Sequence, residues 1–196
     1  MNYTLFILAL VLAYLMGNIS PSTILAKARG LDIKKEGSGN AGTTNALRVM
    51  GKKAALITLI IDAGKGWLAV FIARQFLPDK LAFFCALAVF VGHVWPAIYK
   101  FKGGKGVATA FGTLLAINWQ LALICLGIVA LMVIIFKMVS LGSITAALVF
   151  PVLAWFMEPE FLPAGICMAL ILLFKHRQNI KRILTGTENK ISFSKK

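Results

Sequence analysis

The chain has 196 residues, 59% of them hydrophobic, and a mean hydropathy of +0.84. A soluble domain of this length has no interior large enough for so much apolar sequence, so an ordinary soluble protein is excluded and a membrane protein is indicated. Only 14% of the residues are charged, yet the net charge is +14. Such a charge favours phosphates or anionic lipid headgroups as partners. We expect one domain over residues 1–196 and no nucleic-acid partner.

Seven apolar runs follow one another along the chain, and each is predicted to be a membrane-spanning helix, which gives an all-α fold. The runs are about Tyr3–Ala26, Ala54–Ile72, Leu81–Tyr99, Gly106–Ile117, Leu121–Phe136, Leu141–Met157 and Phe161–Phe174. A spanning helix needs roughly 20 residues. The fourth run is much shorter, and the alternative for it is a re-entrant segment.

The distribution of basic residues sets the expected topology. With seven spans, 18 of the 21 lysines and arginines fall in the first, third and fifth loops and the C-terminal tail, on one side of the membrane; the tail includes Lys195 and Lys196. Only Arg74 and Lys80 fall on the other side, and Lys65 lies within a span. Cytoplasmic loops are enriched in Lys and Arg, so the N-terminus is predicted outside and the C-terminus in the cytoplasm. Removing the fourth span would export the basic tail, which argues against the re-entrant alternative.

A glycine- and lysine-rich stretch, residues 101–109, connects two apolar runs on the predicted cytoplasmic side. Glycines let backbone N–H groups approach an anion and lysines neutralise it, so the stretch is a candidate phosphate site. Lys105 is the candidate phosphate ligand, because Gly103, Gly104 and Gly106 surround it. Lys102 is interpreted as one of the basic residues that set the membrane orientation. Glycine follows Lys105 where a P-loop has Ser or Thr, so a P-loop nucleotide site is not indicated. The alternative is a flexible turn that carries topology lysines.

A second polar cluster, residues 38–45, lies in the long first loop. Its hydroxyls, amides and glycines suit hydrogen bonds to a phosphate or a polyol. The candidate residues are Ser38, Gly39, Asn40, Gly42, Thr44 and Asn45. Thr43 or Thr44 is expected to cap a short helix on which Asn45 and Arg48, three residues apart, share a face. The alternative is an ordinary loop before a capped helix at the membrane surface.

His176 and Asn179 form a third cluster, three residues apart, just after the last apolar run. The alternative here is a basic tail at the level of the lipid headgroups. Asp62 and Lys65, within one span, are interpreted as a structural ion pair, and His93 as a helix-packing or hydrogen-bonded residue. The acidic residues are too few and scattered for a metal site, so neither a metal nor another cofactor is expected.

The motifs together resemble the bacterial acyl-phosphate:glycerol-3-phosphate acyltransferases. The stretches that carry the resemblance, in order along nearly the whole chain, are Gly-Asn-Ile-Ser-Pro (17–21), Ser-Gly-Asn-Ala-Gly-Thr-Thr-Asn (38–45), Gly-His-Val-Trp-Pro (92–96), Phe-Lys-Gly-Gly-Lys-Gly-Val-Ala-Thr (101–109) and His-Arg-Gln-Asn-Ile-Lys-Arg-Ile-Leu-Thr-Gly-Thr-Glu (176–188). The resemblance implies a seven-helix enzyme of the bacterial inner membrane with a cytoplasmic active site. It implies acyl transfer from acyl phosphate to the 1-hydroxyl of glycerol 3-phosphate, giving lysophosphatidic acid and inorganic phosphate in phospholipid synthesis.

The resemblance also implies roles for individual residues. It places Ser38, Asn45, Arg48, His176 and Asn179 in the active site, Gly103, Gly104 and Lys105 on a substrate phosphate, and Glu188 in a supporting role. The donor is already activated, so alignment and charge neutralisation are expected to dominate, with a donor phosphate oxygen accepting the alcohol proton and His176 as the rival base. The protein is expected to function beside an enzyme that produces acyl phosphate. The alternative from another functional class is a transporter for a phosphorylated metabolite. The position of all three polar clusters on one predicted face of the membrane argues against it, because transporter sites lie near the midplane.

Overall fold

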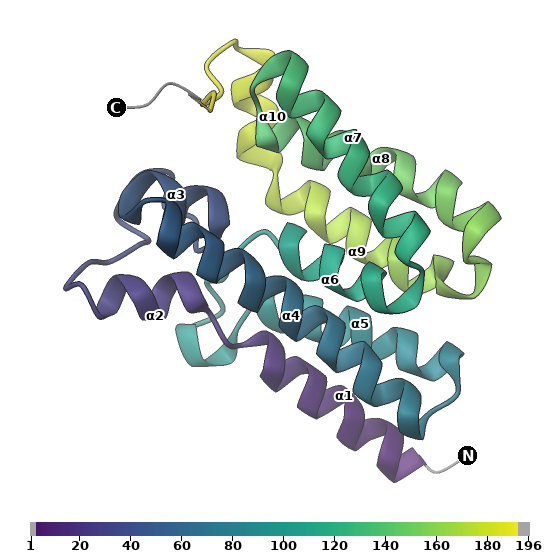
Figure 1. The fold of residues 1–196 in the computed structure, drawn as a ribbon. Helices are drawn as coiled ribbons and strands as arrows, with labels where there is room; N and C mark the ends of the chain where they lie inside the picture. The colour runs from purple at the N-terminus through teal and green to yellow at the C-terminus, as the bar shows by residue number, and fades with distance from the viewer. Residues whose placement is uncertain (1–2, 192–196) are drawn as a thin grey trace. The chain divides into compact units, whose positions relative to one another are not determined.

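The computed structural model describes residues 3–191, so Lys195 and Lys196 of the basic tail lie outside the described part. Every regular element within those residues is helical, which confirms the all-α prediction (Figure 1). The helices are α1 (Tyr3–Gly17), α2 (Pro21–Lys27), α3 (Thr43–Met50), α4 (Lys52–Phe76), α5 (Asp79–Val94), η1 (Ala97–Tyr99), α6 (Val107–Ile117), α7 (Trp119–Phe136), α8 (Val139–Met157), η2 (Pro159–Phe161), α9 (Leu162–Lys175) and α10 (Arg177–Leu184). The chain divides into two compact units after Trp119. The single domain over residues 1–196 stays a prediction.

Five helical stretches in the described chain are long and apolar enough to cross a membrane, and a sixth is added if the bent pair α9–α10 counts as one span. The five are Tyr3–Lys27, Lys52–Phe76, Asp79–Tyr99, Trp119–Phe136 and Val139–Met157. The fourth predicted span is the short apolar helix α6. At 1.5 Å per residue its 11 residues reach about 16 Å, roughly half of a hydrocarbon core. The total of seven spans therefore stays a prediction.

The first predicted span is helical but interrupted. Helix α1 ends at Gly17, and α2 begins at Pro21. Proline disfavours helical geometry at the preceding residue, which is Ser20, but suits the first turn of a new helix. The interruption leaves carbonyl groups at the end of α1 without the N–H partners that a continuous helix would supply.

Helices α1, α4, α5 and α6 pack side by side in the first unit (Figure 1). Small side chains such as Ala13, Ala69 and Ala82 are buried where α1, α4 and α5 meet. Where α4 crosses α6, a Cβ on Gly66 would collide with the backbone of Thr109, and one on Gly112 with the backbone of Ala63. Small residues let membrane helices approach closely. This crossing holds α6, which directly follows the glycine-rich stretch, against α4.

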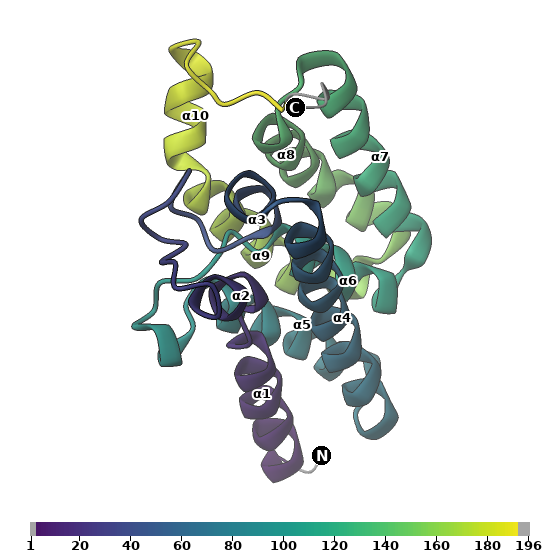
Figure 2. The same ribbon diagram turned by 60° about the vertical axis from the view of Figure 1, so that its left-hand side comes forward.

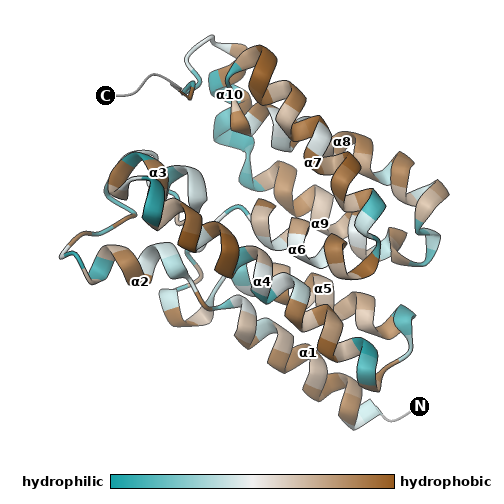
Figure 3. Ribbon diagram, viewed as in Figure 1, coloured by the Kyte–Doolittle hydropathy of each residue, from teal (hydrophilic) through white to brown (hydrophobic). Residues whose placement is uncertain are grey.

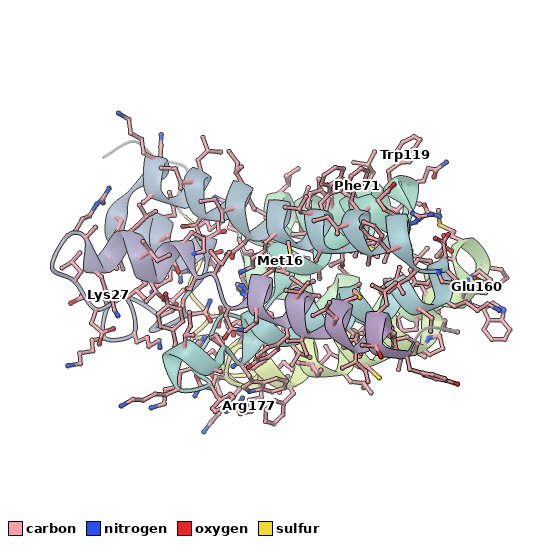
Figure 4. All side chains as sticks on the ribbon, turned by 90° about the horizontal axis from the view of Figure 1, so that it is seen from below. Met16, Lys27, Phe71, Trp119, Glu160 and Arg177 are labelled. Atoms are coloured by element: carbon pink, nitrogen blue, oxygen red, sulfur yellow. The ribbon has the colours of Figure 1, made fainter. Side chains whose placement is uncertain are left out.

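Helices α2 and α3 contact the same end of α4 in the first unit (Figure 2). Polar residues gather at that end, while α4 is hydrophobic over most of its length (Figure 3). Lys27 lies at the polar end, and Phe71 and Trp119 lie toward the opposite end (Figure 4). The first two predicted clusters therefore lie at the end of the unit that carries the basic residues.

In the second unit, α8 packs against α9, and α10 contacts both. The rings of Phe150 and Phe161 meet edge to face, with centroids 5.9 Å apart. Helix α10 is bent by 55° from the preceding helical segment, and the break falls at His176.

Candidate functional site

Asn45 braces the loop that precedes its own helix. Its side chain is only 1% exposed. The amide donates hydrogen bonds to the carbonyl oxygens of Ile33 (3.2 Å) and Glu36 (3.0 Å), and Oδ1 accepts from the backbone N–H of Ser38 (2.8 Å). With three hydrogen bonds to the loop, the Asn45 amide fixes where the exposed Ser38 side chain is presented.

The capping expectation for helix α3 is wrong. The residue that caps it is Gly42, no side chain forms a cap hydrogen bond, and Thr43 is already its first residue. The hydroxyl of Thr43 is buried and, among the described groups, has no hydrogen-bond partner. Asn45 and Arg48 lie three residues apart on this helix, as expected, but the buried Asn45 side chain hydrogen-bonds back to the loop whereas Arg48 is exposed. Arg48 is the exposed cation of this helix, beside a loop held by Asn45.

The glycine-rich stretch is packed against the end of α5. The N–H groups of Gly103 and Gly104 donate to the carbonyl oxygens of Val94 and His93, both at 3.2 Å. A Cβ on Gly103 would collide with the His93 carbonyl, and one on Gly104 with the His93 ring. In this structure these glycines therefore permit close packing, and their N–H groups are committed to backbone carbonyls. The half-buried Lys105 follows directly, and α6 begins two residues later at Val107, after Gly106 with φ +86°.

The first two predicted clusters meet at Gly104. A Cβ on this glycine would lie only 2.7 Å from the carbonyl oxygen of Ala41, within the Ser38–Asn45 cluster. Residues about 60 positions apart in the sequence are thus in contact within the first unit. The meeting brings the segment that carries Lys105 to the loop that precedes Arg48.

A buried polar network lies behind this meeting point. Lys65 Nζ is 2.7 Å from Asp62 Oδ1, as expected for a structural pair. The network also includes His93, whose Nδ1 lies 2.9 Å from Lys65 Nζ and 3.3 Å from Asp62 Oδ1. The sequence did not predict this link, although it contains the relevant signal: a charged pair inside a predicted span and the chain's one histidine inside another.

The third predicted cluster belongs to the second unit, and its convergence with the other two stays a prediction. His176, 2% exposed, lies at the break between α9 and α10, so it and Asn179 do not follow one continuous helix. Its Nδ1 is 2.9 Å from the Leu172 carbonyl oxygen. A carbonyl only accepts, so Nδ1 carries the proton in the neutral ring and Nε2 is the basic nitrogen.

Glu188 is the centre of a hydrogen-bond network around Asn179. Its Oε1 accepts from Asn179 Nδ2 (2.7 Å) and from the Ser140 hydroxyl (2.8 Å), while Oε2 accepts from Arg182 Nε (2.8 Å). The carboxylate therefore joins the start of α8 to α10. This is the geometry of a residue that holds Asn179 in place, and the supporting role of Glu188 stays a prediction.

Glu188→Gln is expected to lower the melting temperature of the detergent-solubilised protein at pH 7 by about 3–12 °C. Hydrogen bonds to a charged group contribute about 1.5–3 kcal/mol, and 1 kcal/mol corresponds to about 2–4 °C for a chain of this length. Burial raises the pKa of Glu188, but the hydrogen bonds from Ser140, Asn179 and Arg182 outweigh it and lower the pKa below 4.5. A lowered folded-state pKa means that this stabilisation is present above pH 4.5 and is lost as the pH falls through the folded-state pKa.

The measurement is thermal unfolding of wild type, Glu188→Gln and the exposed control Glu36→Gln between pH 7 and pH 3. The difference between wild type and Glu188→Gln should shrink toward acid pH. A difference that stays constant, or one that Glu36→Gln reproduces, would contradict the role given to the charge.

Among residues 3–191, no three His, Cys, Asp or Glu side chains are grouped closely enough to hold a metal ion. The described site is instead built from lysine and arginine side chains, an asparagine-braced loop and closely packed glycines. Such a site can neutralise and align phosphate-bearing substrates.

Comparisons with known proteins agree over nearly the whole chain. A model of the family described as glycerol-3-phosphate acyltransferase matches residues 7–186. The glycerol-3-phosphate acyltransferase of Mesorhizobium japonicum is 46% identical over 193 residues, with 97% of this chain and 98% of the relative covered. That of Clostridioides difficile is 44% identical over 201 residues, with 97% of each covered. The crystal structure of PlsY, an integral membrane glycerol 3-phosphate acyltransferase, in its glycerol 3-phosphate form has a TM-score of 0.90 at 33% identity, covering 95% of this chain and 96% of that chain. The lysophosphatidic acid form has a TM-score of 0.87.

Proposed function

The chain belongs to the glycerol-3-phosphate acyltransferase family, and on that premise we propose that it transfers a fatty acyl group from acyl phosphate to the 1-hydroxyl of glycerol 3-phosphate. The products are lysophosphatidic acid and inorganic phosphate. It is a multi-pass integral membrane protein, as its long apolar helices and its similarity to PlsY indicate. The enzyme acts in the first step of phospholipid synthesis, beside an enzyme that makes acyl phosphate.

The observation that carries the proposal is the contact between Gly104 and the Ser38–Asn45 loop. It brings the segment of Lys105 to the loop before Arg48, so that two cations are available on neighbouring segments for two phosphate-bearing substrates. Charge-assisted hydrogen bonds from Lys and Arg are the strong contacts available to a phosphate. Ser38 and the polar groups of Gly39, Asn40, Gly42 and Thr44 supply further contacts to the substrates.

The chemistry proposed for this site needs no strong protein base. Acyl phosphate is a mixed anhydride, so attack by the hydroxyl oxygen on its carbonyl carbon forms the ester and breaks the bond to the phosphate oxygen. The released phosphate takes the alcohol proton.

His176 is the alternative base, because its Nε2 is the basic nitrogen of the neutral ring. His176→Gln keeps hydrogen-bonding capacity but does not titrate near neutrality, so measurable activity in this variant is expected, and its complete loss in a folded variant that still binds glycerol 3-phosphate would assign the base to His176.

A donor comparison with the purified protein in detergent tests the function. With glycerol 3-phosphate as acceptor, acyl phosphate should yield lysophosphatidic acid and stoichiometric inorganic phosphate, and the same acyl chain on coenzyme A should yield at most a few per cent of that rate. Equal use of both donors would contradict the donor assignment. No product with either donor would favour the transporter alternative, because transport has no meaning in detergent.

We further propose a single functional domain over residues 1–196 in the bacterial inner membrane, with seven spans, the N-terminus outside and the active site on the cytoplasmic face. The support is the concentration of basic residues on one side of the predicted topology. The fourth span is then α6, whose 11 residues require local thinning of the bilayer or burial among the other helices.

Single cysteines in a variant that lacks Cys85, Cys125 and Cys167 test this orientation in intact cells. Lys80→Cys and Glu160→Cys, which replace exposed side chains in the predicted outer loops, should react with a membrane-impermeant maleimide. Lys190→Cys should react only after the cells are opened. The reverse pattern would invert the topology, and labelling of Glu160→Cys and Lys190→Cys from the same side would remove a span between them.

A further inference from the structure

The ion pair of α4 is buried in the middle of a predicted span. Asp62 and Lys65 are 2% and 5% exposed. Charges inside a membrane are costly, and they usually pair or serve a function. Besides Asp62, Lys65 Nζ donates to the carbonyl oxygens of Gly17 (3.1 Å) and Ile19 (2.6 Å). The lysine therefore occupies the interruption between α1 and α2, where carbonyls lack helical partners.

His93 extends this pair toward the glycine-rich stretch. One side of its ring, at Nδ1, faces Lys65 and Asp62, and its other nitrogen, Nε2, faces the Cα of Gly104 closely enough that a Cβ there would collide with it. The backbone carbonyl of His93 also accepts the N–H of Gly104. The ring is thus a rigid spacer with the ion pair at one edge and the glycine backbone at the other.

We propose that His93, oriented by Asp62 and Lys65, is a positioning residue that sets the location of Gly104 and so presents Lys105 to a substrate phosphate. The inference rests on the proposed acyl transfer, since it assigns Lys105 the phosphate. Lys65 of α4 contacts Gly17 at the end of α1 and His93 on α5. The position of Gly104 therefore depends on three helices, α1, α4 and α5. His93 acts through the backbone of the stretch and has no role in moving the reacting proton.

A purely packing role accounts less well for these contacts. A buried ion pair contributes little net stability compared with apolar residues of the same volume, because the desolvation of two charges offsets their attraction. The hydrogen bonds between the ion pair and the imidazole do, however, restrict the orientation of the His93 ring, because hydrogen bonds are directional. The network therefore fits a requirement for a defined ring position better than a requirement for filled space.

Two substitutions of His93 test separately the contacts made by the Nδ1 edge and the Nε2 edge of its ring. The side-chain amide of asparagine reaches about as far as Nδ1, so His93→Asn keeps contact with the ion pair and withdraws the edge that faces Gly104. The longer glutamine reaches about as far as Nε2, so His93→Gln restores contact with Gly104. Val89→Ala is the matched control, because Val89 is fully buried on the same helix α5, in a hydrophobic cluster that includes no residue of the glycine-rich stretch.

The first measurement is kcat/KM for acyl transfer. The second is the concentration of inorganic phosphate at which the rise in melting temperature reaches half of its maximum. A ligand that binds the folded state raises the melting temperature of the protein. In His93→Asn we expect kcat/KM to fall at least about tenfold and the half-maximal phosphate concentration to rise by a similar factor, with partial recovery in His93→Gln. Val89→Ala should lower the melting temperature and leave the phosphate dependence as in wild type.

The double variant Asp62→Asn/Lys65→Gln removes both charges and keeps polar groups. It should shift the phosphate dependence in the same direction as His93→Asn, because the ring loses its orienting partners. Wild-type phosphate dependence and kcat/KM in both His93→Asn and the double variant would overturn the positioning role. A wild-type protein that binds phosphate but makes no lysophosphatidic acid from acyl phosphate would defeat the proposed function instead, and the phosphate dependence of the variants would still decide the role of His93.

Discussion

Lys105→Ala is expected to lower kcat/KM by about 10- to 150-fold, whereas Lys102→Ala should stay within about threefold of wild type. A charge-assisted contact to a phosphate contributes about 1.5–3 kcal/mol, and each 1.4 kcal/mol is a factor of ten. The two lysines have the same charge and lie three residues apart in one stretch. They differ in environment, because Lys105 is half-buried after the packed glycines and Lys102 is exposed. The comparison therefore separates a fixed cation at the site from a general positive surface.

The assay should vary both substrates, because a lost phosphate contact appears in KM if it acts equally on the ground state and in kcat if it strengthens in the transition state. Arg48→Ala is expected to change in the same direction as Lys105→Ala. If Lys105→Ala and Lys102→Ala lose activity equally, the stretch acts only through its total charge. If neither loses activity, the phosphate assignment is wrong.

Gly104→Ala is expected to lower kcat/KM by about 100-fold or more. Its new Cβ would meet the His93 ring and the Ala41 carbonyl oxygen, and both are held, the ring by Lys65 and Asp62 and the carbonyl as part of the backbone. The stretch must then shift away from α5, and a displacement of about 1 Å in a positioning element can cost about 10²-fold in rate. The overpacking itself costs roughly 1–3 kcal/mol of stability.

Gly64→Ala is the matched control for this substitution. Gly64 lies in α4, and a Cβ there would meet nothing within 4 Å. Alanine is about 1 kcal/mol more favourable than glycine inside a helix, so Gly64→Ala should be as active as wild type and at least as stable. Wild-type kcat/KM in Gly104→Ala would show that the close packing at His93 has no bearing on the reaction.

The long apolar runs could be predicted from the sequence because length and hydropathy alone identify them. The predicted run Ala54–Ile72 falls within α4, and Gly106–Ile117 differs from α6 by a single residue at its start. Pro21 and Pro96 mark real interruptions, since proline restricts the residue before it. Hydropathy alone does not reveal the interruption after Gly17, because a break of a few residues barely changes the average over a span.

The contacts of the site could not be predicted in the same way. Membrane helices are hydrophobic on all sides, so periodicity does not reveal which face of α4 meets α5, and the link from Lys65 to His93 depends on that face. The turn of Asn45 back toward Ile33 depends on the path of a loop that has no periodic pattern. Likewise, Gly42 and not a threonine is the capping residue of α3, and the run of small polar residues before the helix does not distinguish between them.

The ion pair of α4 also bears on how the chain enters the bilayer during synthesis. Asp62 and Lys65 are three residues apart on one helix, so each finds its counter-charge as soon as that helix forms. An unpaired Asp or Lys at the centre of a helix opposes insertion by about 2.5–3.5 kcal/mol on the scale measured for the translocon. Neutralisation within the segment lowers that barrier before α5, with His93, has left the ribosome. We therefore expect the middle of α4 to insert with the Asp62 and Lys65 charges already cancelled, and the link to His93 to form only when α5 packs against it.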